Sequence, residues 1–167
     1  MTAGLREKHD SMTGRSDVRV WLRLLSCSTI IEKRLRRRFV ARYDTTLPRF
    51  DVLAALERQP DGITMGELSR GLLVSNGNVT ALVRHLEGEG HVASRPAPDD
   101  RRSTIVALTP QGRAHFAELA AAHHDWIAGL FAGMSRTDQN ALHSLLATLK
   151  TSIAADTRDE DGQEEDA

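Results

Sequence analysis

Hydrophobic residues recur along the first third of the chain at the three- and four-residue spacing of helices. Between Asp17 and about Tyr43, the residues that fall on one stripe are Val18, Trp21, Leu25, Ser28, Ile31, Leu35 and Phe39. This spacing is typical of an amphipathic helix. A second helix is predicted from Leu47-Pro48 to Glu57, because proline suits a first helical turn and the turn sequence QPDG follows at residues 59–62.

A short helix followed by a longer one is predicted in the middle of the chain. Thr64 and Glu67 have the spacing of a capping box, in which each side chain accepts the backbone N–H of the other residue. After a break at residues 73–75, the helical period returns with Val79, Leu82, Val83 and Leu86. Gly90 can close this helix in the left-handed conformation. Asn76-Gly77, a dipeptide typical of hairpin turns, stands near its start.

After Gly90 the hydrophobic residues no longer follow the spacing of a helix. Two short extended runs, about His91–Arg95 and Ser103–Leu108, are joined by a tip rich in proline, aspartate and arginine, which predicts a two-stranded hairpin. Thr109-Pro110 then caps a helix that reaches about Leu130. Residues 135–138 open a last helix, whose hydrophobic residues are Leu142, Leu145, Leu146, Leu149 and Ile153.

The predicted fold class is mainly α with a small β-hairpin wing, and the middle of the chain has the element order of a winged helix-turn-helix. The expected segments are a disordered arm at 1–16, a long N-terminal helix within 17–47 and the winged helix-turn-helix at 48–110. C-terminal helices are expected at 110–155, and an acidic, disordered tail at 156–167.

The net charge of −1 hides an uneven distribution. Residues 156–167 hold seven carboxylates and one arginine, whereas residues 19–113 hold 16 Lys and Arg against 10 Asp and Glu. The chain has no apolar run of membrane-spanning length, and its start lacks a secretory signal, so we expect a cytoplasmic protein without a membrane partner. A lone cysteine, Cys27, excludes an intrachain disulfide framework.

The polar face of the helix after residue 75 suits DNA. With its hydrophobic residues turned inward, this helix presents Asn76, Gly77, Asn78, Thr80 and Arg84, after Ser75 as N-cap. Asparagine can read adenine edges in bidentate fashion, and glycine keeps a close approach clear. The alternative is that these first residues only extend a loop and that the helix starts at Asn78.

The predicted hairpin tip carries a second polar cluster, Asp99 to Arg102. Arginines on a hairpin tip can enter a narrow minor groove, and a nearby carboxylate can hold a guanidinium in a fixed pose. The alternative interpretation of this cluster is a solvated turn.

The segment TMGELSRGLLVSNGNVTALVRHLEGEGHVASRPAPDDRRSTIVALTPQG resembles the DNA-binding core of the MarR family of transcriptional regulators. The most specific part is DRRSTIVALTPQG, from Asp100 to Gly112. The resemblance implies a homodimer formed through the N- and C-terminal helices, a palindromic double-stranded DNA operator and, usually, repression relieved by a small ligand. It also implies that Asp100 orients Arg102 in a groove and that Arg101 contacts phosphate.

The same resemblance places an effector between the dimerisation helices and the DNA-binding lobe. The candidate ligand-binding residues are Trp21, Leu24, Cys27, Ser28, Arg36, Arg38, Phe50 and His115. Each is alternatively plain core or interface. The favoured effectors are aromatic carboxylates or their CoA thioesters. The basic run from Lys33 to Arg38 could bind ligand phosphates or DNA backbone, or could be a solvated face.

Other functions are less well supported by the sequence. No nucleophile–base pair or phosphate loop can be placed on adjacent elements, so we expect no enzyme and no cofactor. His123 and His124 point about 100° apart on a helix, so we expect no metal site. The remaining alternatives are a winged-helix protein-interaction module without DNA binding and a redox-sensing regulator that uses Cys27, although we expect Cys27 to be a small buried hydrophobe.

Overall fold

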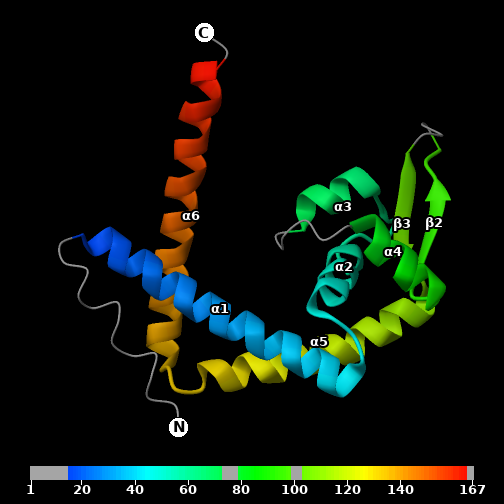
Figure 1. Cartoon of the computed structure of the whole chain (residues 1–167), viewed down its shortest axis with the longest axis horizontal. Helices are drawn as coiled ribbons and strands as arrows, with labels where there is room; N and C mark the ends of the chain where they lie inside the picture. Colours follow the sequence, from blue (N-terminus) through cyan, green and yellow to red (C-terminus); the bar gives the residue numbers. More distant parts are fainter. Residues whose placement is uncertain (1–14, 73–78, 99–102, 165–167) are drawn as a thin grey trace. The chain divides into compact units, whose positions relative to one another are not determined.

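The computed structural model describes residues 15–72, 79–98 and 103–164, and side chains up to residue 155. Along the chain the helices are α1 (Ser16–Tyr43), α2 (Leu47–Glu57), α3 (Met65–Gly71), α4 (Val79–Gly88), α5 (Pro110–Phe131) and α6 (Arg136–Glu164) (Figure 1). The strands are β1 (Ile63–Thr64), β2 (Val92–Pro96) and β3 (Thr104–Leu108). The chain divides into one unit that ends at His124 and a second that begins at Asp125. The predicted fold class, mainly α with a small β wing, is confirmed.

The sheet has three antiparallel strands in the order β1-β3-β2, so β3 lies in the middle. Val92 pairs with Leu108 and Pro96 with Thr104, which confirms the predicted hairpin. Strand β1, in which Ile63 pairs with Val106, was not predicted from the sequence. A two-residue strand is too short to show the alternation of polar and apolar residues, so only its tertiary pairing defines it.

The core of the first unit is built around α2. This helix packs against α1, α3, α4 and β3. The side chains that are essentially inaccessible in this unit are Phe39, Val52, Leu53, Leu56, Leu68, Leu86, Val106 and Leu119. Since burial of each large apolar side chain contributes about 1.5–3 kcal/mol, this cluster holds the helix-turn-helix and the sheet together.

The helix caps predicted from the sequence are present. The Glu67 N–H donates to the Thr64 hydroxyl at 3.2 Å, and the Thr64 N–H donates to the Glu67 carboxylate at 2.8 Å, which completes the capping box. At the end of α4, Gly90 has a φ of 76°, and the His91 N–H donates to the Leu86 carbonyl at 2.9 Å. Because these bonds are local, sequence spacing alone was sufficient to predict them.

The predicted stripe on α1 is buried only near its C-terminal end. Leu35 and Phe39 are buried, whereas Trp21 and Leu25 are 56% and 43% exposed in this chain. The N-terminal half of α1 therefore carries a hydrophobic surface that the described residues of its own unit do not cover.

The second unit contains the end of α5 and the whole of α6. Ser135 caps α6, because the Asp138 N–H donates to its hydroxyl at 3.1 Å. The helix continues to Glu164, so residues 156–164 are helical rather than the disordered tail expected from their charge. Extending an existing helix by one residue costs far less than nucleating one, which gives a physical reason for the difference. Within the described ranges, no helix is long and apolar enough to cross a membrane.

Candidate nucleic-acid interface

Helix α4 has one buried and one exposed face. Val83 and Leu86 are buried against the core, while Thr80 and Arg84 are exposed. Thr80 and Arg84 therefore lie on a polar, solvent-facing surface, as the sequence predicted. Three further predicted contacts, Ser75, Asn76 and Asn78, lie outside the described residues.

Helix α3 packs against α4 and against β3, and so completes the helix-turn-helix beside the sheet. A hollow of about 390 Å³ opens between the start of α3 and the sheet, and it is lined by Thr64, Met65, Gly66, Arg70, Ser103 and Thr104. Arg70 is exposed and adds a cation to this surface, and its place there was not predicted from the sequence.

A side chain of β2 ties the β2–β3 wing to the preceding part of the chain. The Arg95 guanidinium donates to the Asp61 carbonyl oxygen at 3.1 Å, which connects β2 to the loop before β1. Toward the tip, the Ala97 N–H donates to the Ser103 carbonyl at 2.9 Å. The predicted tip residues Asp100, Arg101 and Arg102 lie outside the described residues. The structure thus describes the support of the wing rather than its contact tip.

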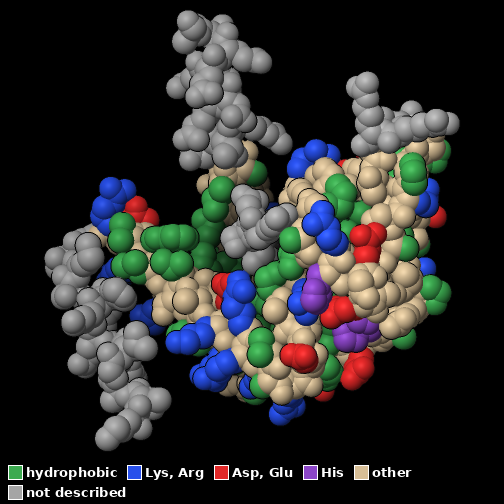
Figure 2. Space-filling view, turned by 45° about the vertical axis from the view of Figure 1, so that its right-hand side comes forward, with side chains coloured by type: hydrophobic (Ala, Val, Ile, Leu, Met, Phe, Trp, Pro, Cys, Tyr) green, Lys and Arg blue, Asp and Glu red, His purple; other side chains and the backbone are tan. Residues whose placement is uncertain are grey.

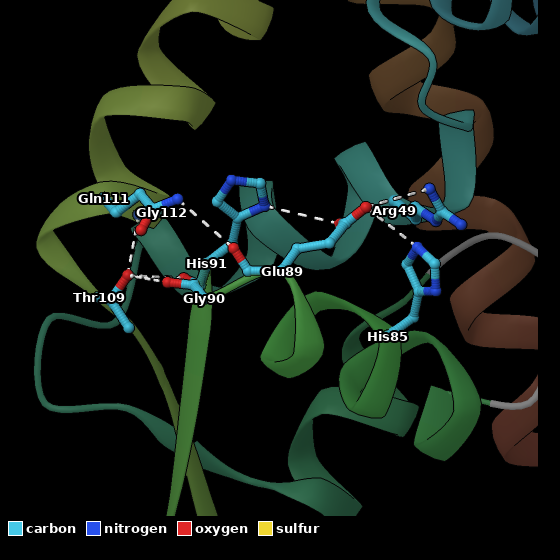
Figure 3. A network of polar contacts seen from close by, with 8 residues as sticks. All are labelled: Arg49, His85, Glu89, Gly90, His91, Thr109, Gln111 and Gly112. Atoms are coloured by element: carbon cyan, nitrogen blue, oxygen red, sulfur yellow. Dashed lines mark hydrogen bonds and ion pairs between the residues drawn. The ribbon is translucent and has the colours of Figure 1, made fainter.

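A polar network surrounds the end of α4 (Figure 3). One carboxylate oxygen of Glu89, Oε1, lies 3.1 Å from His85 Nε2 and 3.8 Å from Arg49 Nη1. The other oxygen lies 3.6 Å from His91 Nδ1. Histidine side chains also lie next to acidic ones on the surface in Figure 2. This network was not predicted from the sequence, although the four-residue spacing of His85 and Glu89 on a helix was a usable signal.

Thr109 and Gly112, at the start of α5, contact the segment that connects α4 to β2. The Thr109 hydroxyl donates to the Gly90 carbonyl at 2.7 Å and accepts the Gly112 N–H at 2.9 Å. A Cβ at position 112 would lie 2.7 Å from the carbonyl carbon of His91, too close for any side chain. The start of α5 therefore packs directly against the backbone that connects α4 to β2.

Half-buried histidines line the side of α5 that faces the core. The His115 ring stacks on His91 with centroids 4.2 Å apart. Burial, and then the nearby His91, lower the pKa of His115, and burial followed by His124 lowers the pKa of His123. His123 lies among aromatic rings, 4.8 Å from the centroid of Phe50. No group of three or more potential metal-binding side chains occurs in the described part of the chain.

The predicted ligand-binding residues lie in different surroundings. Phe50 is buried in an aromatic cluster with Phe39, Phe116 and His123. Trp21 and Ser28 are exposed on α1, and Leu24 is half-buried there. Cys27 is also exposed, so the expectation of a small buried hydrophobe is wrong, because the described residues of its unit do not cover this part of α1. The roles of these residues in ligand binding remain predictions.

The predicted basic run on α1 is largely exposed. Arg36 is paired with Glu32 one turn earlier, its Nε lying 2.9 Å from the carboxylate, and Arg38 is half-buried. Lys33, Arg34 and Arg37 are exposed.

Asp51 is the most perturbed acid in the described part of the first unit. Burial raises its pKa to about 6, with Arg36 acting in the opposite direction and Glu32 in the same one. Its Oδ2 atom is buried and has no hydrogen-bond partner among the described residues. This group could not be predicted from the sequence, because burial of an aspartate on α2 depends on the packing of α1.

Comparison with known proteins assigns this architecture to a family. A sequence model described as "MarR family" matches residues 43–103. The transcriptional activatory protein BadR of Rhodopseudomonas palustris is 39% identical over 97 residues. That match covers 57% of this chain and 55% of BadR, so the chain spans little more than half of that relative.

Solved structures extend the similarity over most of the chain. A MarR family transcriptional regulator from Silicibacter pomeroyi is 31% identical, with a TM-score of 0.72, over 82% of this chain and 94% of that one. A MarR family regulator from Streptomyces coelicolor, solved in complex with DNA, has the same fold at 20% identity, with a TM-score of 0.72 and coverage of 86% and 92%. These proteins are transcriptional regulators and not enzymes, in agreement with the predicted absence of catalysis. From its sequence and its winged helix-turn-helix, this chain belongs to the MarR family of transcriptional regulators.

Proposed function

We propose that this chain is a DNA-binding transcriptional regulator that reads its operator with α4 and contacts flanking DNA with the β2–β3 wing. The observation that carries the proposal is the two-sided α4, whose Val83 and Leu86 are buried while Thr80 and Arg84 are exposed beside α3 and the sheet. In helix-turn-helix proteins the second helix lies in the major groove, with its N-terminal residues facing the bases. The Streptomyces coelicolor relative solved with DNA supports the same use of the fold.

The proposed DNA contacts fall into two classes, those to the bases and those to the phosphates and the minor groove. Asn76, Asn78 and Thr80 read base edges, with Ser75 as the helix cap, because amide and hydroxyl groups can both donate and accept. Arg84 and Arg101 neutralise phosphates, and Arg102 enters the minor groove, oriented by Asp100.

We also infer a homodimer and a palindromic operator. Support comes from large hydrophobic side chains that remain exposed in the single chain. On α1 they include Trp21 and Leu25, and on α6 they are Leu145, Leu146, Leu149 and Ile153. An exposed stripe at helical spacing is what a partner helix covers. Two symmetric copies would bind two half-sites related by the same twofold axis.

A small ligand is proposed to control DNA binding, with aromatic carboxylates or their CoA thioesters as the favoured class. The exposed cations Lys33, Arg34 and Arg37 on α1 support a phosphate-bearing ligand, because clustered ammonium and guanidinium groups suit phosphate oxygens. We favour repression relieved by the ligand. BadR is named an activatory protein, so a reporter assay should allow either sign.

The contact face of α4 can be tested with Arg84→Ala. Duplexes are first selected from a random library by the wild-type protein, and affinity is then measured by fluorescence anisotropy at several salt concentrations. We expect weaker binding and a slope of log affinity against log salt that is smaller by about 0.9, the value for one lost phosphate contact. Arg136→Ala, which removes an exposed cation at the start of α6, is the control and should leave both quantities unchanged.

Two results would contradict the proposal. If the wild-type protein selects no duplex, the protein-interaction module becomes the better interpretation. If Arg84→Ala and Arg136→Ala behave alike, α4 is not the contact helix. Ligand control is tested separately, by measuring release of the selected duplex by aromatic carboxylates and acyl-CoA thioesters, because a ligand releases DNA only if it binds the two states differently.

A further inference from the structure

Glu89 lies where four parts of the first unit meet. It follows α4 directly, and its carboxylate faces His85 on the last turns of α4, Arg49 in the first turn of α2 and His91 just before β2 (Figure 3). The His91 ring in turn stacks on His115 of α5 at 4.2 Å with an interplanar angle of 7°. One acidic side chain thus connects the end of α4 with α2, the wing and, through His91, α5.

The contacts of Glu89 differ in length. His85 Nε2 is at hydrogen-bond distance, 3.1 Å, whereas Arg49 and His91 lie at 3.8 and 3.6 Å. His91 Nδ1 is buried and has no hydrogen-bond partner among the described residues. Protonation of a histidine converts such a contact into a charge-assisted hydrogen bond, which is shorter and stronger than a neutral one. The network therefore becomes stronger when its histidines are charged.

Further titratable groups of α5 lie beside this network. On α5, the ring of His115 stacks on the ring of His91, and Glu118 interacts electrostatically with His115. Burial, and then the neighbouring His91, lower the pKa of His115, so a charge on both stacked rings is disfavoured. The Glu89 carboxylate faces both His85 and His91, and the Arg49 guanidinium lies near the same carboxylate.

We propose that Glu89 is a positioning residue that fixes α4 relative to α2, the wing and α5, and that protonation of His85 and His91 strengthens this hold. The inference rests on the proposed DNA binding, since α4 is the helix whose placement would matter. DNA affinity would then depend on pH through the contacts that Glu89 makes with these two histidines.

The test compares Glu89→Gln with Glu87→Gln at pH 6 and pH 8, at constant ionic strength, on the selected duplex. Both variants remove one negative charge near the end of α4, and no ion pair is recorded for Glu87 in the described part of the chain. Loss of an acidic charge alone would tighten binding to DNA. We expect Glu89→Gln instead to weaken binding about three- to tenfold at pH 6, as for loss of a small network of partly exposed ion pairs, and less at pH 8.

A second variant connects the effect to histidine. His85→Gln cannot be protonated, so it should reduce the gain in affinity between pH 8 and pH 6 in the wild-type background. In the Glu89→Gln background it should have little further effect, because its partner is already absent. Since His85 is exposed, this comparison does not depend on a variant that fails to fold.

The possible failures are distinguishable. A wild-type protein that binds no DNA would overturn the proposed function and this inference together. A wild-type protein that binds, with Glu89→Gln and Glu87→Gln showing the same affinities at both pH values, would overturn only the positioning role. Equal effects of His85→Gln in both backgrounds would show that His85 acts on DNA directly, and would overturn its coupling to Glu89.

Discussion

The buried carboxylate of Asp51 should make the fold less stable above pH 6 than it would be without the charge. Burial raises the pKa of this group from 3.8 to about 6, and its Oδ2 has no hydrogen-bond partner among the described residues. The substitution Asp51→Asn keeps the shape of the side chain and removes its charge. We therefore expect the variant to be more stable than the wild-type protein at pH 7.5.

The size and sign of this effect follow from proton linkage. Between pH 3.8 and 6 the native state binds more protons at Asp51 than the unfolded state, so this group lowers the free energy of unfolding as the pH rises. A pKa raised from 3.8 to about 6 corresponds to at most about 3 kcal/mol. The side chain is only half-buried and Arg36 acts against the shift, so solvent screening reduces the expected gain to about 1 kcal/mol.

Urea unfolding followed by circular dichroism, at pH 4.5 and 7.5, measures this difference. The advantage of Asp51→Asn over the wild-type protein should be larger at pH 7.5 than at pH 4.5 by about two thirds of this gain, because most unfolded chains already carry the ionised carboxylate at pH 4.5. His115 and His123, whose pKa values are lowered, act in the opposite direction, since they destabilise the fold as pH falls. They are present in both proteins and cancel in the comparison. Exposed Asp125→Asn serves as the control.

Two outcomes would refute the reasoning. If the advantage of Asp51→Asn does not change with pH, the carboxylate carries no penalty for its charge in the folded state. If the advantage of Asp51→Asn falls between pH 4.5 and pH 7.5, the ionised carboxylate contributes a favourable interaction that outweighs its burial, and its pKa lies below the ordinary value.

The remaining predictions concern the junction between β3 and α5. Thr109→Ala should lower the free energy of unfolding by about 1–2 kcal/mol in urea titrations, because it removes the α5 cap and the bond to the Gly90 carbonyl, and a loss below about 0.3 kcal/mol would count against both roles. Gly112→Ala should cost about 2–3 kcal/mol, because its Cβ would meet the His91 backbone. Gly129→Ala, in the same helix with open space around it, should instead be neutral or stabilising by up to about 1 kcal/mol, so similar results for the two glycines would contradict the packing argument.

The local signals in the sequence were sufficient for most of the helices. The Thr64–Glu67 capping box, the Thr109 cap and the left-handed Gly90 are made by residues within a few positions of each other, and all are found in the structure. The inward face of α4 followed equally from its periodicity. Such features depend on backbone geometry that a short segment carries with it, so they can be predicted without knowledge of the fold.

Parts of the candidate DNA contact were predicted from the same kind of signal. The exposure of Thr80 and Arg84 agrees with the prediction, and the order of elements led to a winged helix-turn-helix. The sequence also determined the chemistry available at that surface, namely amides, hydroxyls and guanidinium groups.

Only the tertiary structure decided what distant segments do to one another. It paired Ile63 with Val106, brought Arg49 to Glu89, and buried the carboxylate of Asp51. It also left Cys27 exposed where a buried residue was expected. Each of these depends on contacts between residues far apart in the chain, and neither hydrophobic periodicity nor capping motifs encode which long-range neighbours a side chain will meet.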